Sequence, residues 1–258
     1  MGGESTTRTA PHSGGGTSSG PVGSRTGQRL SGAAVALGLV LFLAGFGWAA
    51  LTYRPYTVPT SSMAPTIDAG DRVLAQVVDG DEVRRGDVVV FTDKTWADNA
   101  PVVKRVVAVG GDTVSCCTDG KLTVNGRQIE ESYLPEGSPA EIKNFASVEV
   151  PEGRLFLLGD ERQGSLDSTA HLTDAAAGTV ARGAVKARVD AVVWPMEGML
   201  ERPTGFEPLG ALSRQGPLST IGWLIVVGAA LVLGGGAYGP IAQRVTRRSR
   251  PESAGVSR

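Results

Sequence analysis

Residues 102–109 read Val102-Val103-Lys104-Arg105-Val106-Val107-Ala108-Val109, an apolar run interrupted by two adjacent basic side chains. Short runs rich in β-branched residues are typical of buried strands. Other short segments rich in valine and leucine lie before and after this run, and Gly, Pro, Asp or Asn separates most of them. They cover residues 72–78, 87–91, 122–124, 155–158 and 185–193. This spacing predicts a mainly β domain.

The dipeptide Asn125-Gly126 separates residues 122–124 from residues 127–129. Both residues tolerate the positive φ of a type I′ turn, so we expect a hairpin here. The sequence between residues 54 and 217 shows no long helical period and no internal repeat. Long helices are therefore expected only outside this region.

Two stretches without any charged residue flank the β-rich region, at residues 30–53 and 215–243. A helix needs about 20 apolar residues to cross a bilayer, and each stretch is long enough. The alternatives are buried helices of a soluble protein and, for the first stretch, a cleaved signal peptide. The apolar core at residues 33–51 is longer than the usual signal-peptide core, which favours a retained anchor. We predict transmembrane helices at residues 31–53 and 218–242, although Gly234-Gly235-Gly236 weakens the second.

Arginines mark the outer ends of both predicted spans. Arg25 and Arg29 precede the first span, and Arg244, Arg247, Arg248 and Arg250 follow the second. Short arginine-rich segments stay in the cytoplasm. We therefore predict a multi-pass protein of the plasma (cytoplasmic) membrane, with both termini cytoplasmic and residues 54–217 forming an extracytoplasmic domain.

The remaining segments are predicted tails. Residues 1–30 are mostly Gly, Ser and Thr and form a disordered cytoplasmic tail in this interpretation. Residues 243–258 form a basic cytoplasmic tail that can touch anionic membrane lipid.

The 258-residue chain has a net charge of -1, which does not indicate a nucleic-acid partner.

Histidine chemistry has little support in this sequence. His12 lies in the predicted cytoplasmic tail, so a Ser-His-Asp triad would depend on His171 alone, and a lone loop histidine is usually only solvated. Two histidines on opposite sides of a membrane cannot supply a zinc site together with two adjacent cysteines. We therefore expect no metal and no organic cofactor.

Cys116 and Cys117 are neighbours in a compartment expected to be oxidising. The sequence leaves three states open: a disulfide between them, two thiols, or disulfides to other chains. No candidate base lies nearby in sequence, so neither cysteine is a candidate nucleophile.

Serine and lysine remain as candidates for catalysis. Residues 57–66 read Thr57-Val58-Pro59-Thr60-Ser61-Ser62-Met63-Ala64-Pro65-Thr66, in which two prolines bracket three hydroxyl residues. The prolines exclude a helix and favour a rigid turn that can present one hydroxyl, although a Ser/Thr-rich linker would look the same. Lys104 lies among valines, where burial would lower its pKa and leave a neutral amine. Valines lie on both faces of this strand, so the pattern does not say whether Lys104 or Arg105 points inward. An exposed lysine at a sheet edge is the alternative.

Taken together, these segments resemble the signal peptidase I (leader peptidase) family of serine-lysine endopeptidases. Four blocks in the same order carry the resemblance, at residues 59–66, 85–91, 104–112 and 159–168. The resemblance implies an antiparallel β-sheet catalytic domain flanked by the two transmembrane helices. It assigns Ser62 as nucleophile and Lys104 as general base. It also implies an oxyanion hole from the Ser62 N–H and the Thr60 hydroxyl, and a hydrogen bond from Ser165 that orients Lys104.

The family implies that exported preproteins are the partners and that their signal peptides are cleaved after Ala-x-Ala-like sites. Val58, Met63 and Ile67 flank the nucleophile and are expected to wall a shallow substrate pocket. The chain departs from the family pattern at Thr60, where serine is more frequent. It also has Glu161, Gln163 and Gly164 in place of Asn, Asp and Asn. Thr169 replaces an arginine, which puts an ion pair to Asp167 in doubt.

Two other functions are compatible with parts of this pattern. The departures in the last block would suit an inactive membrane-anchored scaffold of the same fold, although Ser62, Lys104 and Ser165 are all present. A serine-lysine protease that cleaves itself to switch a regulator would need a regulatory domain, and the sequence shows only spans and tails around the β domain.

Overall fold

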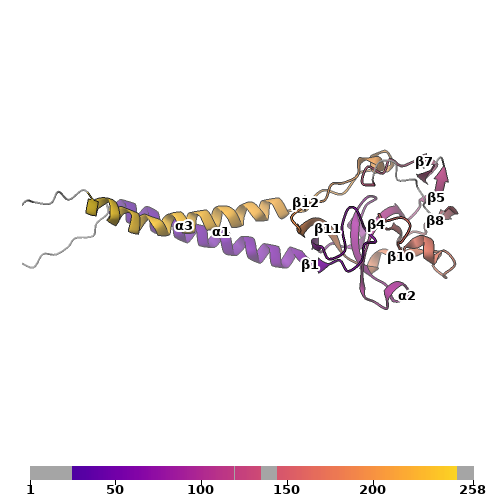
Figure 1. The fold of residues 1–258 in the computed structure, drawn as a ribbon, viewed down its shortest axis with the longest axis horizontal. Coiled ribbons are helices and arrows are strands. Elements are labelled where there is room, and N and C mark those ends of the chain that lie inside the picture. Colours follow the sequence, from indigo (N-terminus) through magenta and orange to yellow (C-terminus); the bar gives the residue numbers. More distant parts are fainter. Residues whose placement is uncertain (1–24, 119, 135–143, 249–258) are drawn as a thin grey trace, which may run out of the picture. The chain divides into compact units, whose positions relative to one another are not determined.

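The computed structural model describes residues 25–118, 120–134 and 144–248. The chain divides into a helical unit, from residues up to 44 and from 224 onward, and a sheet unit of residues 45–223. Two long helices, α1 (Arg25–Thr52) and α3 (Leu218–Arg248), connect to the sheet unit at its two chain ends (Figure 1). Both are long and apolar enough to cross a membrane, over Gly27–Thr52 and Leu218–Tyr238.

Each helix extends beyond the apolar stretch that predicted it. The first begins at Arg25, inside the predicted tail of residues 1–30, and ends one residue before the predicted boundary at 53. The second continues to Arg248, past the predicted boundary at 242. Hydropathy marks only the apolar part of a helix, and Arg and Gln are good helix formers beyond it. The rest of both predicted tails lies outside the described residues.

Within the helical unit, α1 and α3 pack through glycines. A side-chain carbon at Gly38 would lie 2.7 Å from the Gly228 carbonyl oxygen, and one at Gly228 would lie 2.6 Å from the Phe42 nitrogen. Ser31 Oγ donates a hydrogen bond to the Gly235 carbonyl oxygen at 2.7 Å. Small residues allow such close backbone approach in membrane helix pairs. The glycine run that weakened the sequence prediction therefore includes part of the packing face.

The sheet unit is built of short antiparallel strands. Their bounds are β1 (Tyr53–Thr57), β2 (Arg72–Gln76), β3 (Val88–Thr92), β4 (Pro101–Val109), β5 (Thr113–Thr118), β6 (Lys121–Val124), β7 (Arg127–Gln128), β8 (Phe145–Glu149), β9 (Arg154–Leu158), β10 (Thr179–Ala181), β11 (Val185–Trp194) and β12 (Gly198–Met199). The larger sheet has the order β1-β2-β11-β3-β4-β9-β10, with β12 paired to β11. The smaller sheet has the order β7-β6-β5-β8. The remaining short elements are α2 (Lys94–Ala97) and four 3-10 turns, at Gly80–Glu82, Ser168–His171, Arg182–Ala184 and Thr204–Leu209.

The predicted mainly β, antiparallel fold is confirmed. Each of the six valine- and leucine-rich segments contains a strand, and β6 and β7 form the predicted hairpin with positive φ at Asn125 and Gly126. The sequence prediction missed β1, β5, β8, β10 and β12. Pro55 lies in β1, which is tolerated because β1 is an edge strand of the larger sheet.

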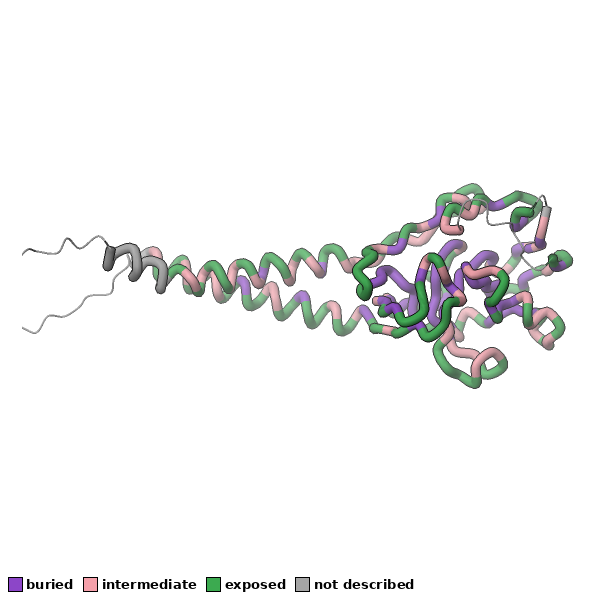
Figure 2. Tube along the Cα trace, viewed as in Figure 1, coloured by how far each residue is buried: buried purple, intermediate pink, exposed green. Residues whose placement is uncertain are grey.

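The core of the sheet unit lies along the central strands, which are buried in Figure 2. One apolar cluster contains Val73, Val88, Val90 and Val189 together with Met63 and Ile67 from the loop after β1. The side chains of Met63 and Ile67 therefore hold that loop against the larger sheet.

A buried polar cluster joins the two chain ends of the sheet unit. Tyr53 Oη, at the start of β1, donates to Asp190 Oδ2 at 3.0 Å, and Arg202 pairs with Asp190 Oδ1 at 2.5 Å. Gly216 lies so close that any side chain there would collide with Asp190 and Tyr53. Burial and the Asp190 charge raise the pKa of Tyr53, so its hydroxyl remains a donor.

Candidate active site

Ser62 lies in a loop between β1 and β2 that is closed at its base. The Val58 N–H donates to the Asp71 carbonyl at 2.9 Å, and the Gly70 N–H donates to the Val58 carbonyl at 2.7 Å. Above this base, the Ile67 N–H donates to the Met63 carbonyl at 2.9 Å. The side chains of Met63 and Ile67 are fully buried, whereas Ser62 keeps partial exposure. The loop thus holds the Ser62 hydroxyl at the surface on a fixed backbone.

Lys104 lies on β4 and contacts Ser62 directly. Lys104 Nζ and Ser62 Oγ are 2.6 Å apart in a hydrogen bond, and the lysine is only 3% exposed. The strand pairs with β3 through Val89 at this position, so the backbone carrying the amine is held by the sheet. The alternative of an exposed lysine at a sheet edge is wrong for this residue.

Burial lowers the pKa of Lys104 to about 8, against the opposing effects of the Asp167 and Asp160 carboxylates. Desolvation disfavours the ammonium form because the charge loses its hydration. A substantial fraction of the side chain is therefore a neutral amine at mildly alkaline pH. A neutral amine in contact with a hydroxyl can accept its proton.

Arg105 is buried as well, and its charge is matched by a carboxylate. Its guanidinium donates to Asp160 through Nε at 2.8 Å and Nη2 at 2.6 Å, and it lies 3.8 Å from the centre of the Tyr133 ring. Burial alone would lower the pKa of Arg105, but Asp160 raises it, so the guanidinium stays ionised. Neighbouring residues of a strand face opposite sides of the sheet. Lys104 and Arg105 are nevertheless both buried, so both faces of β4 are covered at this point.

The Thr60 hydroxyl lies beside the candidate nucleophile. Thr60 Oγ1 donates to Ser62 Oγ at 3.3 Å, and Thr60 is itself exposed. A hydroxyl in this place can turn toward a substrate oxygen that arrives next to Ser62. The structure thus brings together Ser62, Lys104 and Thr60, and their catalytic roles stay a prediction.

The loop after β9 contacts the backbone of Ser62. The Glu161 N–H donates to the Ser62 carbonyl oxygen at 3.2 Å. Any side chain at Gly159 would collide with that same oxygen and with Ser165 Oγ, so Ser165 and Ser62 are near neighbours across Gly159. Only glycine permits this approach.

Ser165 is 1% exposed, and its Oγ has no hydrogen-bond partner among the described residues. The expected hydrogen bond from Ser165 to Lys104 is therefore not formed in this structure. A buried hydroxyl without a partner is costly, which favours a small movement or a water that satisfies it. Its role in orienting Lys104 stays a prediction.

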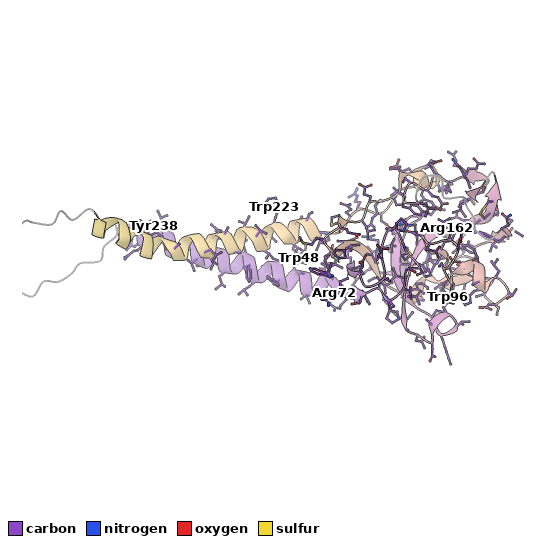
Figure 3. The ribbon with its side chains drawn as sticks, in the orientation of Figure 1. Trp48, Arg72, Trp96, Arg162, Trp223 and Tyr238 are labelled. Atoms are coloured by element: carbon purple, nitrogen blue, oxygen red, sulfur yellow. A yellow bond between two sulfur atoms is a disulfide. The ribbon has the colours of Figure 1, made fainter. Side chains whose placement is uncertain are left out.

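A network that the sequence did not reveal supports this loop. Arg162 Nε donates to the Gly159 carbonyl at 2.9 Å, and its Nη2 pairs with Glu131 and reaches the Tyr133 hydroxyl. Figure 3 marks Arg162 within the sheet unit. Glu131 and Tyr133 lie about thirty residues away in sequence in a segment without regular structure, so no local pattern could have indicated them.

His171 belongs to a separate contact group. Its ring stacks on Trp96 with centroids 4.5 Å apart, and Nδ1 pairs with Asp174 at 2.8 Å. Ser62 Oγ contacts Lys104 and Thr60, and both are hydrogen-bond partners other than histidine. His12 lies outside the described residues.

A sequence profile described as "Signal peptidase, peptidase S26" matches residues 30–194, more than half of the chain. This chain belongs to the signal peptidase S26 family. Individual relatives agree. "Signal peptidase I" of Mycobacterium tuberculosis is 34% identical over 191 residues, covering 55% of this chain and 65% of the relative. "Signal peptidase I" of Bacillus licheniformis is 39% identical over 128 residues, covering 46% and 67%. The chain thus spans just under two thirds of the length of the mycobacterial relative.

A second mycobacterial relative and one solved structure are also similar. The "Probable signal peptidase I" of Mycobacterium leprae is 31% identical over 215 residues, covering 61% of this chain and 74% of the relative. A crystal structure of a signal peptidase I from Enterococcus faecalis V583 has 25% sequence identity and a TM-score of 0.32, covering 46% of this chain and 96% of that one.

In this S26 chain the doubtful Asp167–arginine pair is replaced by neutral donors. Asp167 Oδ1 accepts from the Thr169 N–H at 3.1 Å and from Thr169 Oγ1 at 2.8 Å, and Oδ2 accepts from the Gly159 N–H at 3.0 Å. Asp167 is 2% exposed. A threonine therefore holds the carboxylate in place where an arginine was expected from the family pattern.

The residues predicted to wall the substrate pocket of the S26 site lie in the core. Val58 is 2% exposed, and Met63 and Ile67 have no exposed surface. Their side chains lie in the core beneath the Ser62 loop and are not exposed to a substrate in this structure. Their contact with substrate stays a prediction.

The adjacent cysteines of this S26 chain form a disulfide, which resolves the three states left open by the sequence. Cys116 packs in the apolar cluster with Leu122, Phe145 and Phe156, and the Cys117 N–H donates to Asn144 Oδ1 at 3.0 Å. The pair belongs to β5 of the smaller sheet, whereas Lys104 lies on β4 of the larger sheet.

Proposed function

We propose that this chain is a type I signal peptidase, a membrane-bound serine endopeptidase that removes N-terminal signal peptides from exported preproteins. The observation that carries the proposal is the 2.6 Å contact between Lys104 Nζ and Ser62 Oγ in surroundings that exclude water from the lysine. Family membership and relatives named signal peptidase I support the same activity. Because the nucleophile and base are in contact, nothing in the geometry favours an inactive scaffold.

In the first step, neutral Lys104 accepts the Ser62 proton while the serine oxygen attacks the carbonyl carbon of the scissile peptide bond. The negative charge that forms on the carbonyl oxygen is met by the Ser62 N–H and the Thr60 hydroxyl. The 3.3 Å contact of Thr60 Oγ1 with Ser62 Oγ supports this role. Each such donor is typically worth about 3 kcal/mol in the transition state.

In the second step, the peptide C–N bond breaks and the proton on Lys104 passes to the leaving amine. An ester then joins the signal peptide to Ser62 Oγ. Lys104, neutral again, accepts a proton from a water molecule that attacks this ester. The cleaved signal peptide leaves with a free carboxylate, and the proton returns to Ser62.

An open sheet edge beside Lys104 supports binding of an extended substrate. Residues 101–105 of β4 pair with β3 on one side, whereas β9 pairs with the other side only from Arg105 onward. Among the described residues, the second side of β4 from Pro101 to Lys104 therefore has no strand partner. A substrate strand can add to such an edge through main-chain hydrogen bonds.

We propose that the signal-peptide side of the substrate occupies this open edge, with small residues at the first and third positions before the bond. The side chains of Val58, Met63 and Ile67 are buried beneath the Ser62 loop. The preference for small residues is carried over from the family resemblance, and the peptide experiment below tests it.

The two apolar helices fit a membrane-anchored protein, and we propose that the sheet unit is extracytoplasmic with both termini in the cytoplasm. Trp48 and Trp223 lie near the end of α1 and the start of α3, where these helices adjoin the sheet unit in sequence (Figure 3). Their exposed fractions are 42% and 69%, as expected for aromatic residues at a membrane–water interface. Protease added to cells without a wall should spare a tag placed after Arg258, and digestion of the tag would contradict this topology.

The proposed activity is tested with detergent-solubilised full-length protein and a synthetic Ala-x-Ala peptide. Wild type should cleave the peptide after the second alanine, and Ser62→Ala should abolish cleavage while the protein remains folded by circular dichroism. Ser61→Ala is the matched control, because the neighbouring hydroxyl is exposed and is expected to be dispensable. Cleavage by Ser62→Ala within a few-fold of wild type would contradict the assignment.

A further inference from the structure

Leu166 is an exposed apolar residue on the loop that contacts the active site. Its side chain is 72% exposed, although its neighbours Ser165 and Asp167 are 1% and 2% exposed. Single exposed leucines are ordinary on protein surfaces. This one differs because both flanking residues are fixed against the residues around Ser62.

The backbone on each side of Leu166 is held in place. Asp167 accepts hydrogen bonds from the Gly159 N–H at 3.0 Å and from Thr169 Oγ1 at 2.8 Å. Ser165 packs so closely on Gly159 that no side chain fits there. The leucine is therefore presented on a rigid support, and little conformational entropy is lost when a ligand covers it.

The sheet pairing indicates which part of a substrate meets Leu166. Leu158, the last residue of β9, pairs with Arg105, so β9 fills the edge of β4 from that point onward. A peptide added along residues 101–104 lies in line with β9 and cannot continue past Lys104, because Gly159 follows there. If the substrate binds in this way, the chain beyond the cleaved bond leaves the sheet edge near Gly159, which begins the loop that carries Leu166.

We propose that Leu166 is a specificity residue that contacts an apolar side chain at the first or second position after the cleaved bond. This inference rests on the proposed function, since it takes the signal-peptide side of the substrate to lie along β4. It assigns selectivity to the mature side of the cleavage site, where an apolar side chain would cover part of the exposed leucine surface.

The experiment compares Ala-x-Ala peptides that carry Gly, Leu or Asp at the two positions after the bond. Leu166→Ser is the test variant, and Met196→Ser is the control, because Met196 is 89% exposed and lies after β11. We expect Leu166→Ser to lower the ratio of kcat/KM for the Leu peptide to that for the Gly peptide about fivefold, mainly through KM. Met196→Ser should keep the wild-type ratio.

Two further readouts separate specificity from structural damage. The pH profile of Leu166→Ser should match wild type, because the Lys104 surroundings are unchanged, and Leu166→Asp should select specifically against the Asp peptide. A uniform loss for all peptides, or a loss that follows the residues before the bond, would overturn the role of Leu166. Failure of folded wild type to cleave any peptide would overturn the proposed function, and this inference with it.

Discussion

Thr169 Oγ1 donates a hydrogen bond to Asp167 Oδ1 at 2.8 Å, so a neutral hydroxyl holds this buried carboxylate. Asp167 raises the pKa of Lys104, against the larger effect of burial that lowers it. Because threonine brings no positive charge, the effect of Asp167 on Lys104 is not offset at this position.

Replacing Thr169 should therefore change the pH dependence of cleavage. In Thr169→Arg, a cation next to Asp167 would reduce its effect on Lys104, and the pKa of Lys104 would fall. The acid limb of the kcat/KM profile should move to lower pH by about 0.5–1 unit. Thr169→Ser keeps the hydroxyl and should keep the wild-type profile. An unshifted limb in folded Thr169→Arg would show that Asp167 does not act on Lys104.

The pH profile of wild type follows from the lowered pKa of Lys104. Only the neutral amine accepts the Ser62 proton, so activity should rise with pH, reach half its maximum near the pKa of about 8 and level off above it. Lys104→Arg should lose at least about 100-fold in kcat/KM, because guanidinium stays protonated. His171→Ala should remain active. Peptide cleavage followed across the pH range tests all three proteins, and an active Lys104→Arg would mean that another residue is the base.

The close contact at Gly159 predicts that alanine lowers kcat far more at Gly159 than at Gly164, which lies in the same loop. Gly159→Ala would push Ser165 and the Ser62 carbonyl apart, and a shift of about 1 Å at the site can cost about 100-fold in rate. Gly164→Ala meets only the carboxylate end of Glu161, which can move away. Gly159→Ala should also unfold at a lower temperature than Gly164→Ala, so kcat is measured at a temperature at which both variants are folded. Equal activities would show that the nucleophile tolerates the displacement.

Adjacent regions of α3 should respond differently to a large side chain. Gly228→Leu would collide with the backbone of α1 and separate the helices, whereas nothing lies within 4 Å of the corresponding position at Gly236. Spin labels at the exposed positions Val40 and Val226 report the distance between the helices. We expect a longer or broader distance distribution in lipid vesicles for Gly228→Leu alone. The same distribution for both variants would mean that glycine contacts do not hold the pair.

The disulfide is expected to be dispensable for catalysis. Cys116→Ser combined with Cys117→Ser changes a strand of the smaller sheet and no residue in contact with Ser62 or Lys104. The double variant should retain the kcat of wild type. Its mass should first be measured, to show that the protein carries no other modification. Loss of activity in a folded double variant would connect this sheet to the active site.

Local patterns predicted the strands and the hairpin because valine enrichment and the Asn125-Gly126 turn act over a few residues. The serine and the lysine of the candidate site were found by elimination and by resemblance. The burial of both Lys104 and Arg105 could not be read from the sequence, because valines lie on both faces of β4. It depends on Ser62 and Asp160, which come from other parts of the chain.

The burial of the predicted pocket residues could not be read from the sequence. Val58, Met63 and Ile67 are close to Ser62 in sequence, and their side chains lie in the core. Leu166 is far from Ser62 in sequence, and its neighbour Ser165 lies near Ser62 only because Gly159 permits the loop after β9 to approach. The support from Arg162, Glu131 and Tyr133 is equally long-range and left no local signal.

The buried cluster of Tyr53, Asp190 and Arg202 limits where a truncated protein without the two long helices can begin and end. A soluble fragment that begins after Tyr53 would leave Asp190 without its hydroxyl donor, and one that ends before Arg202 would remove the closer of the two arginines that pair with this buried carboxylate. Removing one partner of a buried charge pair typically costs about 3–5 kcal/mol. A secreted, crystallisable protein should therefore start no later than Tyr53 and extend at least to Gly216, which packs on the same cluster.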